Sequence, residues 1–157
     1  MVGFIEVVIP RKNIITMGED GQKNIKAPTD LIETQAEILL PGANNIKIET
    51  YNKEYFWKVA ESNTSSIHKI IYAYKYPIKS GKSTKAVFDK IKICNYTENQ
   101  FDGNEKINID IHAHGIQANW LQDKNTGVID GKLPDKFTET QAKAIWSLYA
   151  NQNSYNF

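Results

Sequence analysis

The sequence is poor in the residues that cross-link small domains or cross membranes. A single cysteine, Cys94, stands among 157 residues, so no disulfide can form within one chain. No run approaches the roughly 18 apolar residues of a membrane-spanning helix. Positive and negative charges nearly cancel, with 19 Lys and Arg against 18 Asp and Glu. The net charge of +1 supplies no strong field for nucleic acid or an anionic membrane, so we expect neither as a partner.

Length and composition indicate one globular domain over residues 1–157. Hydrophobic residues make up 41% and charged residues 24%, a balance that separates the chain from disordered sequences. A chain of this length can bury a core without disulfides or a structural metal ion. The lysines are spread along the sequence, which is typical of solvated strand faces. We find no repeat, no long linker and no convincing cofactor motif, and we expect no cofactor.

Apolar and polar residues alternate with a period of two through most of the chain, the pattern of half-buried antiparallel strands. The clearest runs lie at residues 46–49, 55–59, 67–76 and 107–114. Turn-forming pairs separate the runs: Pro41-Gly42, Ser80-Gly81, Asp102-Gly103 and Asp130-Gly131. Short strands between such turns predict a mainly β fold, and we expect an antiparallel, jelly-roll-like β-sandwich.

One clear helix is predicted near the C-terminus, over residues 138–150. Thr138 and Gln141 have the spacing of a capping box, which satisfies backbone N–H groups of the first turn. Four apolar residues then follow at helical spacing, so that one face can pack on the sheet: Ala142, Ile145, Trp146 and Tyr149. A short extra helix is predicted over residues 29–35, within a polar and irregular region.

The first ten residues form an apolar strand that we expect Pro10 to end. The segment is too short and too acidic for a signal peptide, so we expect Met1 to be an added start on a mature protein. Six apolar residues make the strand a candidate donor that could complete the sheet of a second subunit: Val2, Phe4, Ile5, Val7, Val8 and Ile9. The alternative is an ordinary strand of its own domain.

Asp110, His112 and His114 alternate along a predicted strand, so their side chains share one face at intervals of about 7 Å. Zinc accepts these ligand types, but the spacing is loose and the sequence supplies no further ligand nearby. A polar, solvent-facing side of a strand is the main interpretation, and a weak metal site is the alternative. His68 is predicted to lie at the surface or half-buried.

Aromatic residues suggest a different kind of site. Tyr72, Tyr74 and Tyr76 fall on one face of a predicted strand and, with Trp120, could form an exposed patch that stacks on sugars. Without a basic groove, the same patch is a weak candidate for binding nucleic acid. Packing in the core or in an interface is the alternative for these residues.

Several short motifs recur in one family of exported proteins. They are Leu40-Pro41-Gly42 before a strand, the aromatic segment 72–93, the segment 109–119 with Ile116-Gln117-Ala118, and the closing segment 141–146 with Trp146. On these motifs, residues 39–150 resemble the TasA/camelysin-like family. The chain departs from the family in having Ser80-Gly81 in place of Pro-Gly, and residues 1–38 match poorly.

The resemblance implies a jelly-roll β-sandwich that is exported to the cell surface or beyond by means of a signal peptide, which a dedicated signal peptidase of the SipW type handles. TasA-like members build fibres of the biofilm matrix, and in related filaments the N-terminal strand of one subunit completes the sheet of the next. Camelysin-like members have been classed as surface metallopeptidases. His112 and His114 fall where the family has residues that are not ligands, so they inherit no metal-binding role.

We therefore expect a structural subunit of an extracellular fibre or matrix that self-associates by β-strand addition and is not an enzyme. Other matrix or cell-surface components are expected as further partners. A monomeric surface module for carbohydrate or protein is the alternative. A metallopeptidase using Asp110, His112 and His114 is the third hypothesis.

Overall fold

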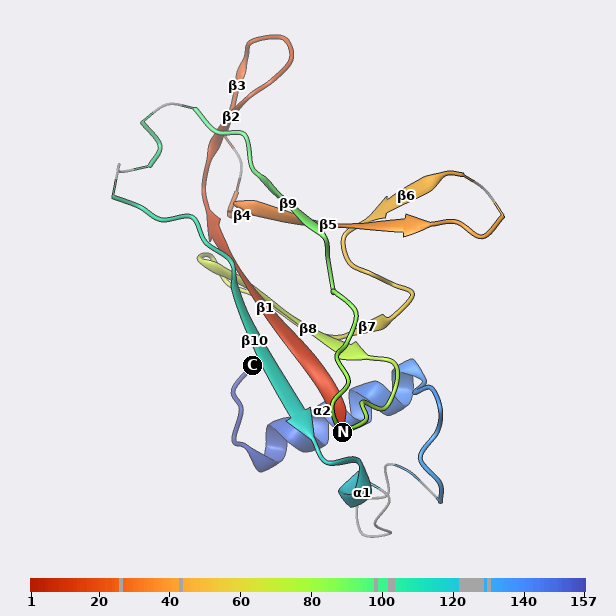
Figure 1. Cartoon of the computed structure of the whole chain (residues 1–157). Coiled ribbons are helices and arrows are strands. Elements are labelled where there is room, and N and C mark those ends of the chain that lie inside the picture. Colours follow the sequence, from red (N-terminus) through yellow and green to blue (C-terminus); the bar gives the residue numbers. More distant parts are fainter. Residues whose placement is uncertain (26, 43, 98, 102–103, 122–128, 130) are drawn as a thin grey trace.

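The computed structural model describes residues 1–25, 27–42, 44–97, 99–101, 104–121, 129 and 131–157 (Figure 1). As predicted, the chain is mainly antiparallel β-sheet in a sandwich-like arrangement, with one long helix near its C-terminus. The elements are β1 (Val2–Lys12), β2 (Ile15–Met17), β3 (Lys23–Ile25), β4 (Thr29–Asp30), β5 (Ile32–Leu39), β6 (Ile46–Glu49), β7 (Phe56–Asn63), β8 (Ile67–Tyr74), β9 (Lys90–Ile93), β10 (Asp110–Ile116), α1 (Ala118–Leu121) and α2 (Glu139–Gln152). Within the described ranges, no helix is long and apolar enough to span a membrane.

The larger sheet is built around β1. Its strands run in the order β10, β1, β8 and β7, and β4 pairs with β1 beyond the end of β10. Residues 2–8 of β1 pair with β10, and residues 4–10 pair with β8. A strand that is apolar on both faces suits this central position, because both of its faces are covered.

The smaller sheet has β5 in the middle, between β6 and β9. Residues 32–35 of β5 pair with β9, whereas residues 36–39 pair with β6. The β5–β6 hairpin projects away from the larger sheet, and β2 with β3 forms a separate hairpin (Figure 1). The smaller sheet therefore covers only part of the larger one.

Two apolar cores lie on opposite faces of the larger sheet. The core beneath α2 contains Val2, Phe4, Ile71, Ala73, Ile116, Leu121, Ile129, Phe137, Ala142, Ile145 and Trp146. The core between the sheets contains Val7, Ile9, Ile32, Phe56, Ile70, Tyr72 and Val87. Because side chains alternate between the faces of a strand, β1 and β8 each supply both cores.

Helix α2 begins as predicted. The side chain of Thr138 accepts a hydrogen bond from the backbone N–H of Gln141, and the side chain of Gln141 accepts one from the backbone N–H of Thr138. Ala142, Ile145 and Trp146 are buried against the sheet. The capping box and the helical spacing together explain why this segment leaves the β pattern.

The prediction of a helix at residues 29–35 is wrong, because this segment contains β4 and the first half of β5. Ile32 and Thr34 are buried while Glu33 between them is exposed, and Ala36 continues the buried face. A period of two therefore holds in this segment, which the short window around residue 30 concealed.

Pro10 does not end the first strand, which continues to Lys12. The carbonyl of Pro10 accepts a hydrogen bond from the backbone N–H of Leu31, on the side where pairing with β10 has already stopped at Val8. The nitrogen of Pro10 faces that same side, so its missing hydrogen removes no bond of the β1–β10 ladder.

We expect Phe4→Ala to lower the free energy of unfolding by about 3–5 kcal/mol, because Phe4 is fully buried and its ring packs 5.2 Å from that of Trp146. Urea unfolding followed by tryptophan fluorescence measures the change. Ile25→Ala is the matched control, since the Ile25 side chain is 82% exposed and should alter the free energy by less than about 0.5 kcal/mol. Equal losses in the two variants would contradict the placement of this core.

Candidate functional site

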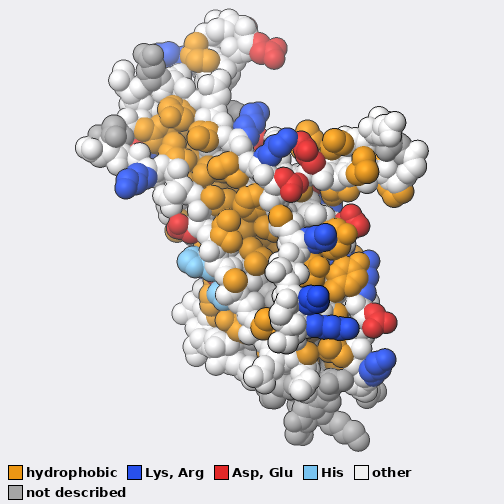
Figure 2. Space-filling model, in the orientation of Figure 1, with side chains coloured by type: hydrophobic (Ala, Val, Ile, Leu, Met, Phe, Trp, Pro, Cys, Tyr) orange, Lys and Arg blue, Asp and Glu red, His pale blue; other side chains and the backbone are white. Residues whose placement is uncertain are grey.

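An apolar strip is exposed where the two sheets fail to meet. Ile111 of β10 is 52% exposed, and Ile91 and Ile93 of β9 are 48% and 54% exposed. Ile93 lies opposite the buried Ile32, and Ile111 lies opposite the buried Val7, so these side chains belong to the inner faces of the two sheets. Figure 2 shows the hydrophobic side chains as a continuous strip along this open side. We call it the open seam, formed by Ile91, Ile93, Ile107, Ile109, Ile111 and Ala113.

Two strand edges border the open seam. β10 is the outer strand of the larger sheet and β9 the outer strand of the smaller one, so within the described part of the chain each has a strand neighbour on one side only. Such edges carry backbone N–H and C=O groups that can pair with another strand. An extended segment entering the open seam would find hydrogen bonds at its edges and apolar side chains between them.

The candidate donor strand lies inside its own domain. Val2, Phe4 and Val7 are fully buried, and β1 has neighbours along both edges. The terminal amino group of Met1 donates a hydrogen bond to the carbonyl of Ile78, whose own N–H donates to the carbonyl of Met1. The described chain therefore completes its own sheet, and β1 could serve a second copy only by exchange.

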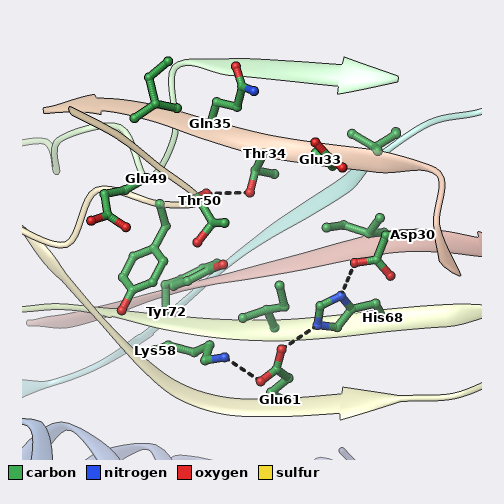
Figure 3. Close-up of a pocket in the computed structure, with 15 residues that line it drawn as sticks. Asp30, Glu33, Thr34, Gln35, Glu49, Thr50, Lys58, Glu61, His68 and Tyr72 are labelled. Atoms are coloured by element: carbon green, nitrogen blue, oxygen red, sulfur yellow. Dashed lines mark hydrogen bonds and ion pairs between the residues drawn. The ribbon is translucent and has the colours of Figure 1, made fainter. Parts of the chain in front are cut away.

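A pocket of about 440 Å³ opens on the other side of the sandwich, between β5 and the pair β7–β8 (Figure 3). Its apolar lining includes Ile9, Ile32 and Ile70, with the rings of Tyr51 and Tyr72 beside them. The ring centroids of these two tyrosines lie 4.8 Å apart. Polar and charged groups form the remaining walls, among them Asp30, Glu49, Lys58, Glu61 and His68.

Five charged side chains join end to end along one wall, and we call them the charge ladder. Lys58 Nζ lies 2.5 Å from a carboxylate oxygen of Glu61, whose other oxygen is 2.8 Å from His68 Nε2. Nδ1 of His68 is 2.6 Å from Asp30, and Arg11 Nε is 3.0 Å from the second oxygen of Asp30. Arg11 and Asp30 form an ion pair, but the Nε–H of Arg11 makes no hydrogen bond because it does not point at the carboxylate oxygen. The ladder ties β4 to three strands of the larger sheet.

The pKa of His68 is raised above its ordinary value near 6.5. The hydrogen bond to Asp30 is the largest cause; burial opposes it, and the hydrogen bond to Glu61 adds to it. A histidine between two carboxylates donates from both ring nitrogens when it is protonated, so the folded chain favours imidazolium. Each carboxylate of the ladder lies between two cationic groups, so the ladder holds β4 to β1, β7 and β8.

Asp110, His112 and His114 share the face of β10 that is turned toward α2, as their alternation predicts. His112 and Asp110 are exposed, whereas the His114 side chain is 15% exposed. Among the residues that the structure describes, no three His, Cys, Asp or Glu side chains gather as they would around a metal ion. His114 serves instead in a hydrogen-bonded link between the sheet and the helix.

That link centres on Glu6, a carboxylate in the apolar strand β1. His114 Nε2 lies 2.7 Å from Glu6, and His114 Nδ1 lies 3.1 Å from the hydroxyl of Tyr149 on α2. Burial raises the pKa of Glu6, but hydrogen bonds from Tyr155 and His114 and the charge of Lys69 outweigh burial, so the pKa is lowered. Glu6 therefore stays ionised beneath the C-terminal residues.

The aromatic residues do not form one exposed patch. Tyr72 is only 2% exposed and lines the pocket, whereas Tyr74 and Tyr76 are half-buried and pack with Tyr55 outside it. Burial raises the pKa of the Tyr72 hydroxyl well above its usual range. Trp120 belongs to α1, and its side chain lies outside the described residues.

The sequence did not predict the hydrogen-bond partners of His68 and His114. A single acidic residue, Glu6, inside an otherwise apolar run was the available signal for a buried ion pair. No comparable signal existed for His68, because Asp30 and Glu61 come from two other strands. Cys94 lies half-buried just after β9.

Comparison with protein-family models, curated proteins and solved structures gives no match for this chain.

We expect His68→Gln to remove a pH-dependent part of the stability. Because the pKa of His68 is higher in the folded than in the unfolded chain, its contribution is complete below about pH 6.5 and is lost as the pH rises through the folded pKa. The variant should lose roughly 1–2 kcal/mol at about pH 5.5 and less at about pH 8.5, with solvent screening of Glu61 keeping the value small. Chemical denaturation at both pH values measures this, and a loss that does not change with pH would contradict a charged His68.

Proposed function

We propose that this chain is a structural subunit of an extracellular or cell-surface fibre or matrix, and that its copies associate by β-strand addition. The open seam is the observation that carries the proposal. Three large isoleucine side chains about half exposed, placed between two strand edges, are costly for a chain that stays alone in water. A partner strand would cover the isoleucines and pair with an edge at the same time.

The position of β1 in the larger sheet supports exchange as the route. β1 lies between β10 and β8, and the same position between these two strands exists in every other copy. In the isolated chain, β1 fills its own slot between β10 and β8. In a fibre, the same strand would fill the slot of a neighbour, and the open seam would extend the contact.

The resemblance of residues 39–150 to the TasA/camelysin-like family supports the same proposal. The motif Ile116-Gln117-Ala118 lies where β10 ends and α1 begins, and Trp146 is a core residue of α2. We propose export to the cell surface and a place in a biofilm matrix on the basis of that resemblance.

We expect the double variant Ile93→Lys, Ile111→Lys to weaken self-association by more than tenfold. Two buried isoleucines stabilise a contact by about 3 kcal/mol or more, and about 1.4 kcal/mol corresponds to a factor of ten. Light scattering coupled to size-exclusion chromatography gives the oligomeric state over a range of concentrations, and negative-stain microscopy shows whether fibres form.

The control is Ile25→Lys, Ile67→Lys, which places the same charges on two isoleucines exposed elsewhere. Both double variants should unfold at the same urea concentration as the parent chain, since no core residue changes. A parent chain that remains monomeric at every concentration, or equal association of the two variants, would overturn the seam as an assembly surface.

Exchange of β1 makes a separate prediction. A fluorescent peptide of residues 2–12 should enter the full chain slowly and migrate with it on size exclusion, because the peptide competes for the slot between β10 and β8. A peptide carrying Phe4→Asp and Val7→Asp should not enter, since both side chains are fully buried in the slot. If fibres form while the first peptide stays free, β1 is not the exchanged strand.

A further inference from the structure

Positive charge is concentrated in one segment of a chain that is nearly neutral. Residues 75–92 contain six lysines and one aspartate, a net charge of +5, while the whole chain carries +1. The rest of the chain is therefore net negative. The spread of lysines along the sequence conceals this asymmetry, which sets one strip of the surface apart from the remainder.

The segment is a long loop followed by β9, and the loop is fixed at both ends to residues 52–55. The backbone N–H of Lys75 donates to the carbonyl of Tyr55, and that of Asn52 donates to the carbonyl of Val87. Between these ends, the backbone N–H of Lys82 donates to the carbonyl of Lys79 in a turn. Gly81 has φ of +73°, a left-handed conformation that favours glycine.

That turn brings two like charges together. The Cα atoms at the ends of a β-turn lie within about 7 Å of each other, so the exposed Lys79 and Lys82 start from neighbouring points of the backbone, and the exposed Lys85 follows three residues later. In β9 the situation differs, because Lys90 forms an ion pair with Glu37 and Lys92 lies opposite Glu33. The unbalanced positive charge therefore lies on the loop.

A group of tyrosines lies beside the loop. The rings of Tyr55 and Tyr74 are nearly parallel at 6.4 Å, and Tyr76 packs within 6.1 Å of Tyr55. Lys85 Nζ stands 5.8 Å from the ring centre of Tyr55, and Lys136 Nζ stands 5.7 Å from that of Tyr76. Ammonium groups and half-buried aromatic rings thus share one surface.

We propose that this surface, formed by Lys79, Lys82, Lys85, Lys136, Tyr55, Tyr74 and Tyr76, binds an acidic polysaccharide. Ammonium groups pair with carboxylates spaced along a flexible polymer, and tyrosine rings stack on the apolar faces of sugar rings. The proposal does not depend on self-association, because none of these residues lies in the open seam.

The observations favour a polysaccharide over nucleic acid. Of the chain's 19 basic residues, 18 are lysine, and the one arginine, Arg11, is held in the charge ladder. The surface therefore lacks the planar guanidinium groups that grip phosphates with two bonds and stack on bases. Outside the loop the net negative charge repels a densely charged strand, whereas a sparsely charged polymer meets less repulsion.

The test is fluorescence anisotropy of a labelled oligo-uronate, with single-stranded DNA of equal total charge as the second probe. We expect Lys79→Gln, Lys82→Gln, Lys85→Gln to weaken binding of the uronate at least tenfold at about 50 mM NaCl, and to flatten its salt dependence. The control variant Lys23→Gln, Lys106→Gln, Lys132→Gln removes the same charge from exposed lysines elsewhere and should bind as the parent does.

A second pair of variants tests the tyrosines. Tyr76→Ala should lower affinity for the uronate without changing its salt dependence, whereas Tyr76→Phe keeps the ring and should retain binding. Equal losses in the two lysine variants would reduce the effect to net charge and overturn the site. Tighter binding of DNA than of uronate would identify a nucleic-acid surface instead, and absence of uronate binding by the parent chain would end the proposal.

Discussion

The backbone hydrogen bonds on both edges of β1 hold the rest of the structure in place. Within the larger sheet, β1 lies between β10 and β8 and joins them, and the side chains of β1 enter both cores. Helix α2 packs on one face of β1 and the smaller sheet covers part of the other. A loss of β1 would therefore expose two cores at once.

Burying this strand has an electrostatic consequence. Glu6 lies among apolar neighbours, and hydrogen bonds from Tyr155 and His114 together with the charge of Lys69 hold its pKa below the ordinary value despite burial. On the opposite face of the larger sheet, the charge ladder also keeps ionised groups paired, by alternating positive and negative side chains across four strands. The ladder lies along the partly solvated wall of the pocket, whereas Glu6 is buried and depends on its hydrogen-bonded partners to offset desolvation.

Local patterns predicted the elements whose signals lie within a few residues. Alternation located β6, β8 and β10, and the capping box with its apolar stripe located α2. The helix predicted at residues 29–35 was wrong because the alternation continues through residue 39, and the strand end predicted at Pro10 was wrong because the missing hydrogen faces an edge where pairing with β10 has already stopped. The open seam could not be foreseen, because alternation assigns Ile93 and Ile111 to inner faces without showing that the opposite layer ends before covering them. The prediction of one exposed patch of tyrosines failed for a related reason. A period of two shows which residues share a face of a strand, but it does not show what covers that face. Tyr72 lies beneath the smaller sheet, whereas Tyr76 does not.

β1 is synthesised long before the two strands with which it pairs. Val7 pairs with Ile70 and Ile111, residues that follow it by roughly sixty and roughly one hundred positions, so neither partner exists while the N-terminal strand is being synthesised. Contacts this distant in sequence close late and slowly, and until then the strand is an unpaired apolar segment. The larger sheet therefore cannot close until the residues of β10 have been synthesised. If β1 is exchanged between copies as proposed above, this interval is when the first strand of one newly made chain would reach the unfilled position between β10 and β8 of another.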